Sequence, residues 1–104
     1  MQLIVADTGG HIAITVKEPR IDAAIATSFK DKMREIVLQG RKPVQMDMRS
    51  VDFMDSSGLG AMVAVRKALP SELPIILVGM TPNVERVFRL TRMDTVFQIQ
   101  SEVT

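Results

Sequence analysis

The 104-residue sequence has no cysteine, no tryptophan and no tyrosine, and it has a single histidine, His11. Without cysteine, the chain cannot form a disulfide framework, a cysteine-ligated zinc or iron–sulfur site, or a thiol nucleophile. One histidine leaves little room for hydrolytic triads or histidine-rich metal sites. The four phenylalanines are too few for the aromatic platforms on which single-stranded bases stack. We therefore expect a protein that is not an enzyme and that carries no metal site and no cofactor.

The chain also lacks a strong excess of either charge and a long apolar run. Thirteen Lys and Arg residues against twelve Asp and Glu residues leave a net charge of +1, which is too small for a dedicated nucleic-acid or membrane-surface protein. Residues 1–8 lack the basic start and the apolar stretch of a secretory signal, and no segment approaches the ~20 apolar residues that span a bilayer. We expect a cytoplasmic protein with no nucleic-acid partner and no membrane partner.

What the sequence does contain is typical of one globular domain. Hydrophobic residues make up 46% of the chain and charged residues 24%, close to the average for folded proteins. A length near 100 residues is enough for one hydrophobic core and too short for two. The prediction is a single domain over residues 1–104.

The hydrophobic pattern alternates between strand-like and helix-like segments. Short β-branched runs flank the turn at Gly9-Gly10, which indicates a hairpin. Apolar residues at spacings of three and four follow, and Gly40 is placed to cap that helix. Strands are expected at 3–6, 12–16, 44–48, 75–78 and 96–99, and helices at about 22–39, at 57–69 and after Thr81-Pro82. The run at 75–78 is apolar throughout, as in strands that are buried under helices on both faces.

This order predicts an α/β fold. Strands separated by helices imply right-handed crossovers and a largely parallel sheet. We expect a mixed, mostly parallel sheet of about five strands, with the N-terminal hairpin as an antiparallel edge, packed with three to four helices.

The most informative segment is 51–60, which joins the carboxyl end of a strand to the amino end of a helix, a place where α/β proteins usually bind ligands and partners. Asp55, Ser56 and Ser57 can each accept a hydrogen bond from the first free amides of the helix. Simple capping is one interpretation. However, Gly58 and Gly60 in the first helical turn each cost up to about 1 kcal/mol relative to alanine, which indicates a close approach to the backbone there.

Known catalytic motifs do not fit this segment. A nucleophile elbow needs Gly-x-Ser-x-Gly, and Ser56 is preceded by Met54 and Asp55. A phosphate-binding P-loop needs a lysine directly after its second glycine, and the next lysine after Gly60 is Lys67. Three carboxylates lie close together in the sequence: Asp47, Asp52 and Asp55. They could bind a metal ion, but such a group is more typical of a solvated loop.

Residues 46–48 (Met-Asp-Met) and 51–60 (Val-Asp-Phe-Met-Asp-Ser-Ser-Gly-Leu-Gly) resemble the signature of the STAS domain, specifically that of the bacterial anti-sigma factor antagonists. Ile21-Asp22 resembles the apolar-Asp pair that precedes the first helix in this family, and the predicted order of elements also matches. The chain departs from the family pattern at 18–20, where Glu-Pro-Arg replaces the usual glycine.

The resemblance implies that Ser56 is phosphorylated by an anti-sigma factor serine kinase, although the residues alone do not distinguish Ser56 from Ser57. It also implies that the unmodified protein binds this kinase and frees a sigma factor, and that a metal-dependent serine phosphatase resets the switch. The partner-binding residues that we expect on this basis are Asp22, Asp55, Ser56, Ser57, Gly58, Leu59, Gly60 and Met62. Burial in the core is the competing interpretation for Leu59, Met62 and Val63.

A different class of function is the main alternative. The chain could be a non-phosphorylated STAS subunit or scaffold of a transporter, lipid-transport or stress-signalling complex. Phosphorylation at Ser56 distinguishes the two classes.

Overall fold

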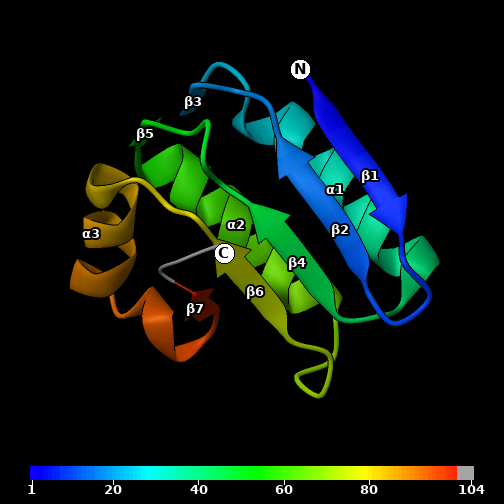
Figure 1. Ribbon diagram of the computed structural model, residues 1–104. Helices are drawn as coiled ribbons and strands as arrows, with labels where there is room; N and C mark the ends of the chain where they lie inside the picture. The colour runs from blue at the N-terminus through cyan, green and yellow to red at the C-terminus, as the bar shows by residue number, and fades with distance from the viewer. Residues whose placement is uncertain (101–104) are drawn as a thin grey trace.

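A five-stranded mixed sheet forms the centre of the computed structural model, which describes residues 1–100 (Figure 1). The strand order is β1-β2-β4-β6-β7. The first pair is antiparallel and the other pairs are parallel. The strands are β1 (Leu3–Asp7), β2 (Ile12–Val16), β4 (Val44–Asp47), β6 (Ile75–Val78) and β7 (Gln98–Gln100). The predicted α/β class, the N-terminal hairpin and the mostly parallel sheet are confirmed.

Two helices, α1 (Ala26–Gly40) and α2 (Ser56–Ala68), pack against each other on the same face of the sheet. Strand register aligns Ile14, Met46 and Leu77 across that face, and all three are at most 1% exposed. On the opposite face the register aligns Ala13, Gln45 and Ile76, which are only half-buried.

The expectation that 75–78 lies under helices on both faces is therefore wrong. The chain moves in one direction through β2, β4 and β6, and right-handed crossovers in one direction place their helices on one side. Helices on both faces would require the strand order to reverse.

The C-terminal part closes the end of the core. The helix α3 (Pro82–Leu90) is followed by a 3₁₀ turn, η1 (Met93–Thr95), before β7. Phe88 and Phe97 are buried and meet edge to face, with ring centroids 5.6 Å apart. Thr81 is the N-cap residue of α3 and Pro82 is its first residue, as the Thr81-Pro82 pair predicts, but the Thr81 hydroxyl makes no capping bond and donates to the Val51 carbonyl at 2.8 Å. The last strand begins at Gln98 rather than at residue 96, because the amides of Val96 and Phe97 donate to the Met93 carbonyl of the 3₁₀ turn.

The ends of α1 differ from the prediction. The helix begins at Ala26, because the Asp22 carbonyl accepts hydrogen bonds from the amides of Ile25 and Ala26 and thereby forms a separate turn. At the other end, Gly40 is the last helical residue and the left-handed cap is Arg41, with φ 46°.

A second, two-stranded sheet lies outside the predicted elements. It pairs β3 (Arg20–Ile21) with β5 (Phe53–Met54) in parallel, and the Asp52 amide donates to the Pro19 carbonyl at 2.8 Å beside it. This sheet joins the segment before α1 to the segment before α2. No helix within residues 1–100 has the length and apolar character needed to cross a membrane.

Candidate functional site

Asp55 organises the start of α2. One of its carboxylate oxygens, Oδ1, accepts a hydrogen bond from the Gly58 amide at 2.9 Å, which is the N-cap bond expected at this position. The other oxygen, Oδ2, accepts from the Ala23 amide at 3.1 Å. The carboxylate therefore fixes the beginning of α2 and links it to the turn before α1, so both of its oxygens already have partners.

Gly58 is buried and accounts for the close approach that its position predicted. A Cβ atom at this residue would overlap the Ile21 carbonyl oxygen and would lie 2.9 Å from Met54 Cγ. The approaching backbone is thus β3 of the same chain and not a partner. This corrects the expectation for Gly58, which supports the site from inside without forming part of its surface.

Ser56 and Ser57 occupy the first two helical positions of α2, and both are exposed. Neither hydroxyl makes a hydrogen bond within the described residues. The amides of Gly58 and Leu59 are bonded to Asp55. The amides of Ser56 and Ser57 have no such bond within residues 1–100, so they are the donors left at the positive end of the helix.

A second carboxylate, Asp22, lies at the turn that Asp55 holds. The Arg20 side chain donates to it through Nε at 3.1 Å, and the Ala24 amide donates to its other oxygen at 3.1 Å. Mainly because of the bond from Arg20, the pKa of Asp22 is lowered from its ordinary value. The Arg20 guanidinium also lies 4.4 Å from the centre of the exposed Phe53 ring. Asp22 is therefore anionic at neutral pH and has a cation beside it.

A shallow groove of about 350 Å³ continues from Ser57 between the two helices. Most of its lining is small, and one cationic side chain contributes: Ala26, Thr27, Lys30, Ser57, Gly60, Ala61 and Ala64. Gly60 is exposed, and a Cβ atom there would meet nothing within 4 Å. The groove therefore allows a partner's backbone or side chain to approach α2 closely.

The remaining predicted contacts on α2 divide between the surface and the core. Leu59 is half-buried and packs against the core, and Val63 is also half-buried. Met62 is 0% exposed. The expectation that Met62 contacts a partner is wrong, because its side chain fills the space between α2 and the sheet.

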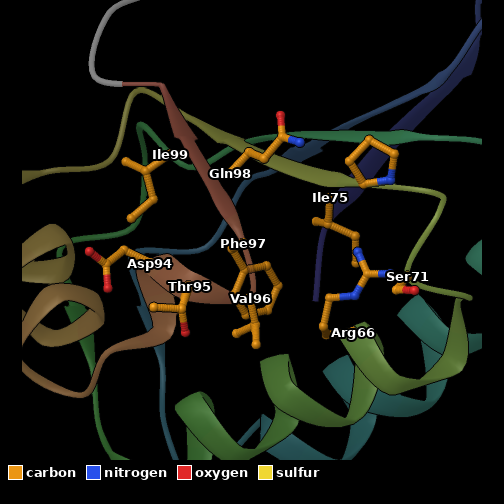
Figure 2. Close-up of a pocket in the computed structure, with 10 residues that line it drawn as sticks. Arg66, Ser71, Ile75, Asp94, Thr95, Val96, Phe97, Gln98 and Ile99 are labelled. Atoms are coloured by element: carbon orange, nitrogen blue, oxygen red, sulfur yellow. The ribbon is translucent and has the colours of Figure 1, made fainter.

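A larger hollow of about 430 Å³ lies at the other end of α2, between Arg66 and the β7 region (Figure 2). Figure 2 shows Phe97 and Val96 between Arg66 on one side and Asp94 on the other. The Arg66 guanidinium donates to the Pro70 carbonyl at 2.7 Å, and burial lowers its pKa. Its charge thus stabilises the carbonyl end of α2.

The carboxylates considered as metal ligands do not gather into a site. Asp47 accepts a hydrogen bond from the Arg49 amide at 3.0 Å and forms an ion pair with the Arg49 side chain at 3.4 Å. Both oxygens of Asp55 are bonded to amides. Within residues 1–100, no group of three acidic or histidine side chains is arranged to hold a metal ion.

Comparison with known proteins identifies the family. The family model described as the STAS domain matches residues 2–104. The chain belongs to the STAS domain family. The resemblance found in segment 51–60 is thereby confirmed. One relative is the anti-sigma-B factor antagonist of Listeria monocytogenes, which is 28% identical over 92 residues that cover 88% of this chain and 80% of the relative.

Solved structures show the same fold. An anti-sigma factor antagonist from Mycobacterium paratuberculosis superimposes with a TM-score of 0.83 at 24% identity, over 98% of this chain and 86% of the other. The Bacillus cell fate determinant SpoIIAA in its phosphorylated form gives a TM-score of 0.69 at 18% identity, over 97% of this chain and 93% of the other. At such low sequence identity, these structural similarities show a shared fold and nothing about function.

Proposed function

We propose that this STAS domain is an anti-sigma factor antagonist that is switched by phosphorylation of Ser56. In its unmodified form it binds an anti-sigma factor serine kinase in the cytoplasm and releases the sigma factor. Phosphorylation by the kinase inactivates it, and a metal-dependent serine phosphatase restores it. The observation that carries this proposal is the exposed Ser56 hydroxyl at the start of α2, next to a groove lined by small residues.

The names of two relatives support the class of function, since both are called antagonists of anti-sigma factors. SpoIIAA, which shares the fold, is described in a phosphorylated form. In this chain the partner surface consists of Asp22, Asp55, Ser56, Ser57, Leu59 and Gly60, with the groove between α1 and α2 beside them.

The helix end explains why the folded domain tolerates a phosphate. A phosphoryl group adds about −1.5 to −2 charges. The amides of Ser56 and Ser57 and the positive end of the α2 dipole favour an anion at this place. The fold is therefore expected to remain intact in both states.

The same charge is unfavourable at an interface. A partner that covers the start of α2 has to desolvate the dianion, and Asp22 and Asp55 lie close to it in the turn and cap described above. Burying an unpaired charge costs several kcal/mol, and each 1.4 kcal/mol is tenfold in affinity. The switch thus acts on binding, with little effect on the structure of the domain itself.

Phosphorylation by purified anti-sigma factor kinases, taken from the organism that encodes this chain, tests the proposal. The chain is incubated with ATP and each kinase, and the modified residue is located by mass spectrometry of peptides. We expect one phosphoryl group on Ser56, no modification of Ser56→Ala, and unchanged modification of Ser57→Ala. Modification of Ser57 instead would overturn the assignment. No modification by any of the kinases would favour the non-phosphorylated scaffold.

A further inference from the structure

The edge strand β1 leaves one side of its backbone open. It lies at the end of the strand order and pairs only with β2 among the described strands (Figure 1). Two of its apolar side chains are strongly exposed, Ile4 at 53% and Val5 at 46%. These two residues point to opposite faces of the sheet, because side chains alternate along a strand.

The hydrogen bonds at both ends of the hairpin show which residues face outward. The Lys17 amide donates to the Gln2 carbonyl at 3.0 Å, and the Thr8 amide donates to the His11 carbonyl at 3.0 Å. In an antiparallel pair, bonded and non-bonded positions alternate. Even-numbered residues of β1 therefore bond to β2, and Leu3, Val5 and Asp7 direct their amides and carbonyls away from the sheet.

This edge has few of the features that usually keep edge strands apart. Natural proteins protect such edges with charged side chains, proline, bulges or very short strands. Residues 3–6 are Leu-Ile-Val-Ala, without charge or proline, and the one charged residue of β1, Asp7, is at its end and is paired with Lys42. The opposite edge differs, because within residues 1–100 β7 is three residues long and both of its glutamines are exposed. The contrast singles out β1 as the edge that is suited to accept another strand.

We propose that β1 pairs with β1 of a second copy of this chain, antiparallel and about a two-fold axis at Val5. Only this register joins all three outward-facing residues of the strand: Leu3 bonds to Asp7 of the second copy, Val5 to Val5, and Asp7 to Leu3. Each such pair exchanges two hydrogen bonds. The two five-stranded sheets become one continuous sheet.

The side chains fit this register. Ile4 lies opposite the small Ala6 of the second copy, and the two Val5 side chains meet at the axis. Asp7 lies opposite an apolar residue and is already paired with Lys42 at 2.8 Å, so like charges do not oppose each other. Pairing through a two-fold axis also closes on itself, whereas pairing β1 with β7 of another copy would produce open chains.

This dimer is independent of the phosphorylation switch. In the strand order, β2 separates β1 from β4, which leads toward α2 and Ser56. Both Ser56 residues therefore remain free in the dimer.

Sedimentation velocity over a range of concentrations tests the dimer. Because one strand pair buries less area than a standard interface, we expect a Kd on the order of 100 µM. Val5→Lys places two lysines opposite each other at the axis and should weaken the dimer at least about tenfold. Leu38→Lys is the matched control, since it adds the same charge at an exposed apolar residue of α1 (42% exposed) and should leave the dimer unchanged.

A wild-type chain that stays monomeric at several times that Kd would overturn the proposal. A dimer that persists in folded Val5→Lys would also overturn it. Circular dichroism checks that the variants are folded. Val5→Pro provides a second variant, because it removes an outward amide without breaking a bond to β2.

Disulfide trapping tests the register. Because the chain has no native cysteine, the introduced cysteine is the only residue that can form a disulfide. In Val5→Cys the two sulfurs lie opposite each other at the axis, where bonded partners have Cα atoms about 5.5 Å apart, within disulfide reach. In Ile4→Cys the two Cα atoms are roughly 8 Å apart, which is beyond it. We expect mild oxidation to cross-link Val5→Cys at least about tenfold faster than Ile4→Cys. Equal rates would exclude the Val5 axis.

Discussion

Asp22 and Asp55 lie at the same end of the molecule but have different environments. Asp55 accepts hydrogen bonds from two backbone amides, so it acts as part of the scaffold. Asp22 is bonded to the Arg20 side chain and the Ala24 amide, so its lowered pKa depends mainly on a side chain that can be replaced. Ser56 directly follows Asp55, which is bonded to the turn that contains Asp22, so a negative charge on Ser56 would add to the negative charge already at this end of the molecule.

The pKa of Asp22 provides a test of the contact between Asp22 and Arg20. Its folded pKa is lowered from 3.8, first by the bond from Arg20. Asp22 therefore contributes stability above its unfolded pKa, and this contribution is lost as the pH falls through the folded pKa. In Arg20→Gln the pKa should rise toward its ordinary value, and the loss should begin at a higher pH. Carboxyl NMR titration measures this shift, and Arg49→Gln should leave the Asp22 pKa unchanged. An unchanged pKa in Arg20→Gln would contradict the assignment.

The first turn of α2 has two glycines with opposite environments. Gly58 faces the Ile21 carbonyl of β3, whereas the space beside Gly60 is open. Sequence reasoning predicted that something approaches this turn closely, and that was right for Gly58. It could not show that the approaching group is internal, because β3 and β5 have two residues each, too few for a periodic pattern.

Replacing each glycine by alanine separates the two roles. Gly58→Ala should lower the free energy of unfolding by about 2 to 4 kcal/mol, because the new Cβ overlaps backbone that cannot move without breaking the β3–β5 sheet. Gly60→Ala should raise it by up to about 1 kcal/mol through helix propensity. Urea denaturation measures both values. Equal effects at the two positions would show that the packing of β3 on α2 is not what requires glycine.

The order of the five main strands and the three α-helices could be predicted from the sequence, and so could the strand-to-helix junction at which the candidate site is proposed. The hairpin, the parallel strands and the helix after Asp55 all have local signals. The coverage of the sheet could not be predicted in the same way. An apolar run such as 75–78 is compatible with helices on one face or both, and strand order decides between them. Strand order depends on contacts between distant segments, and a periodic pattern does not contain it.

The whole domain should respond to charge at Ser56 by losing a partner while keeping its fold. Ser56→Asp adds an anion at a helix start that has no acidic residue in its first turn, a favourable place that offsets repulsion from Asp22 and Asp55. We expect the free energy of unfolding to change by less than about 1 kcal/mol and binding to the kinase to weaken roughly 100-fold. Thermal unfolding and titration calorimetry measure the two effects.

Ser71→Asp is the control for this last prediction, because it adds the same charge at an exposed residue beyond the far end of α2, about 20 Å away along the helix. At physiological ionic strength, charges that far apart are largely screened. Ser71→Asp should therefore bind the kinase as the unmodified protein does. If it weakened binding as much as Ser56→Asp does, net charge and not the start of α2 would govern recognition. If Ser56→Asp bound with unchanged affinity, the partner would dock elsewhere on the domain.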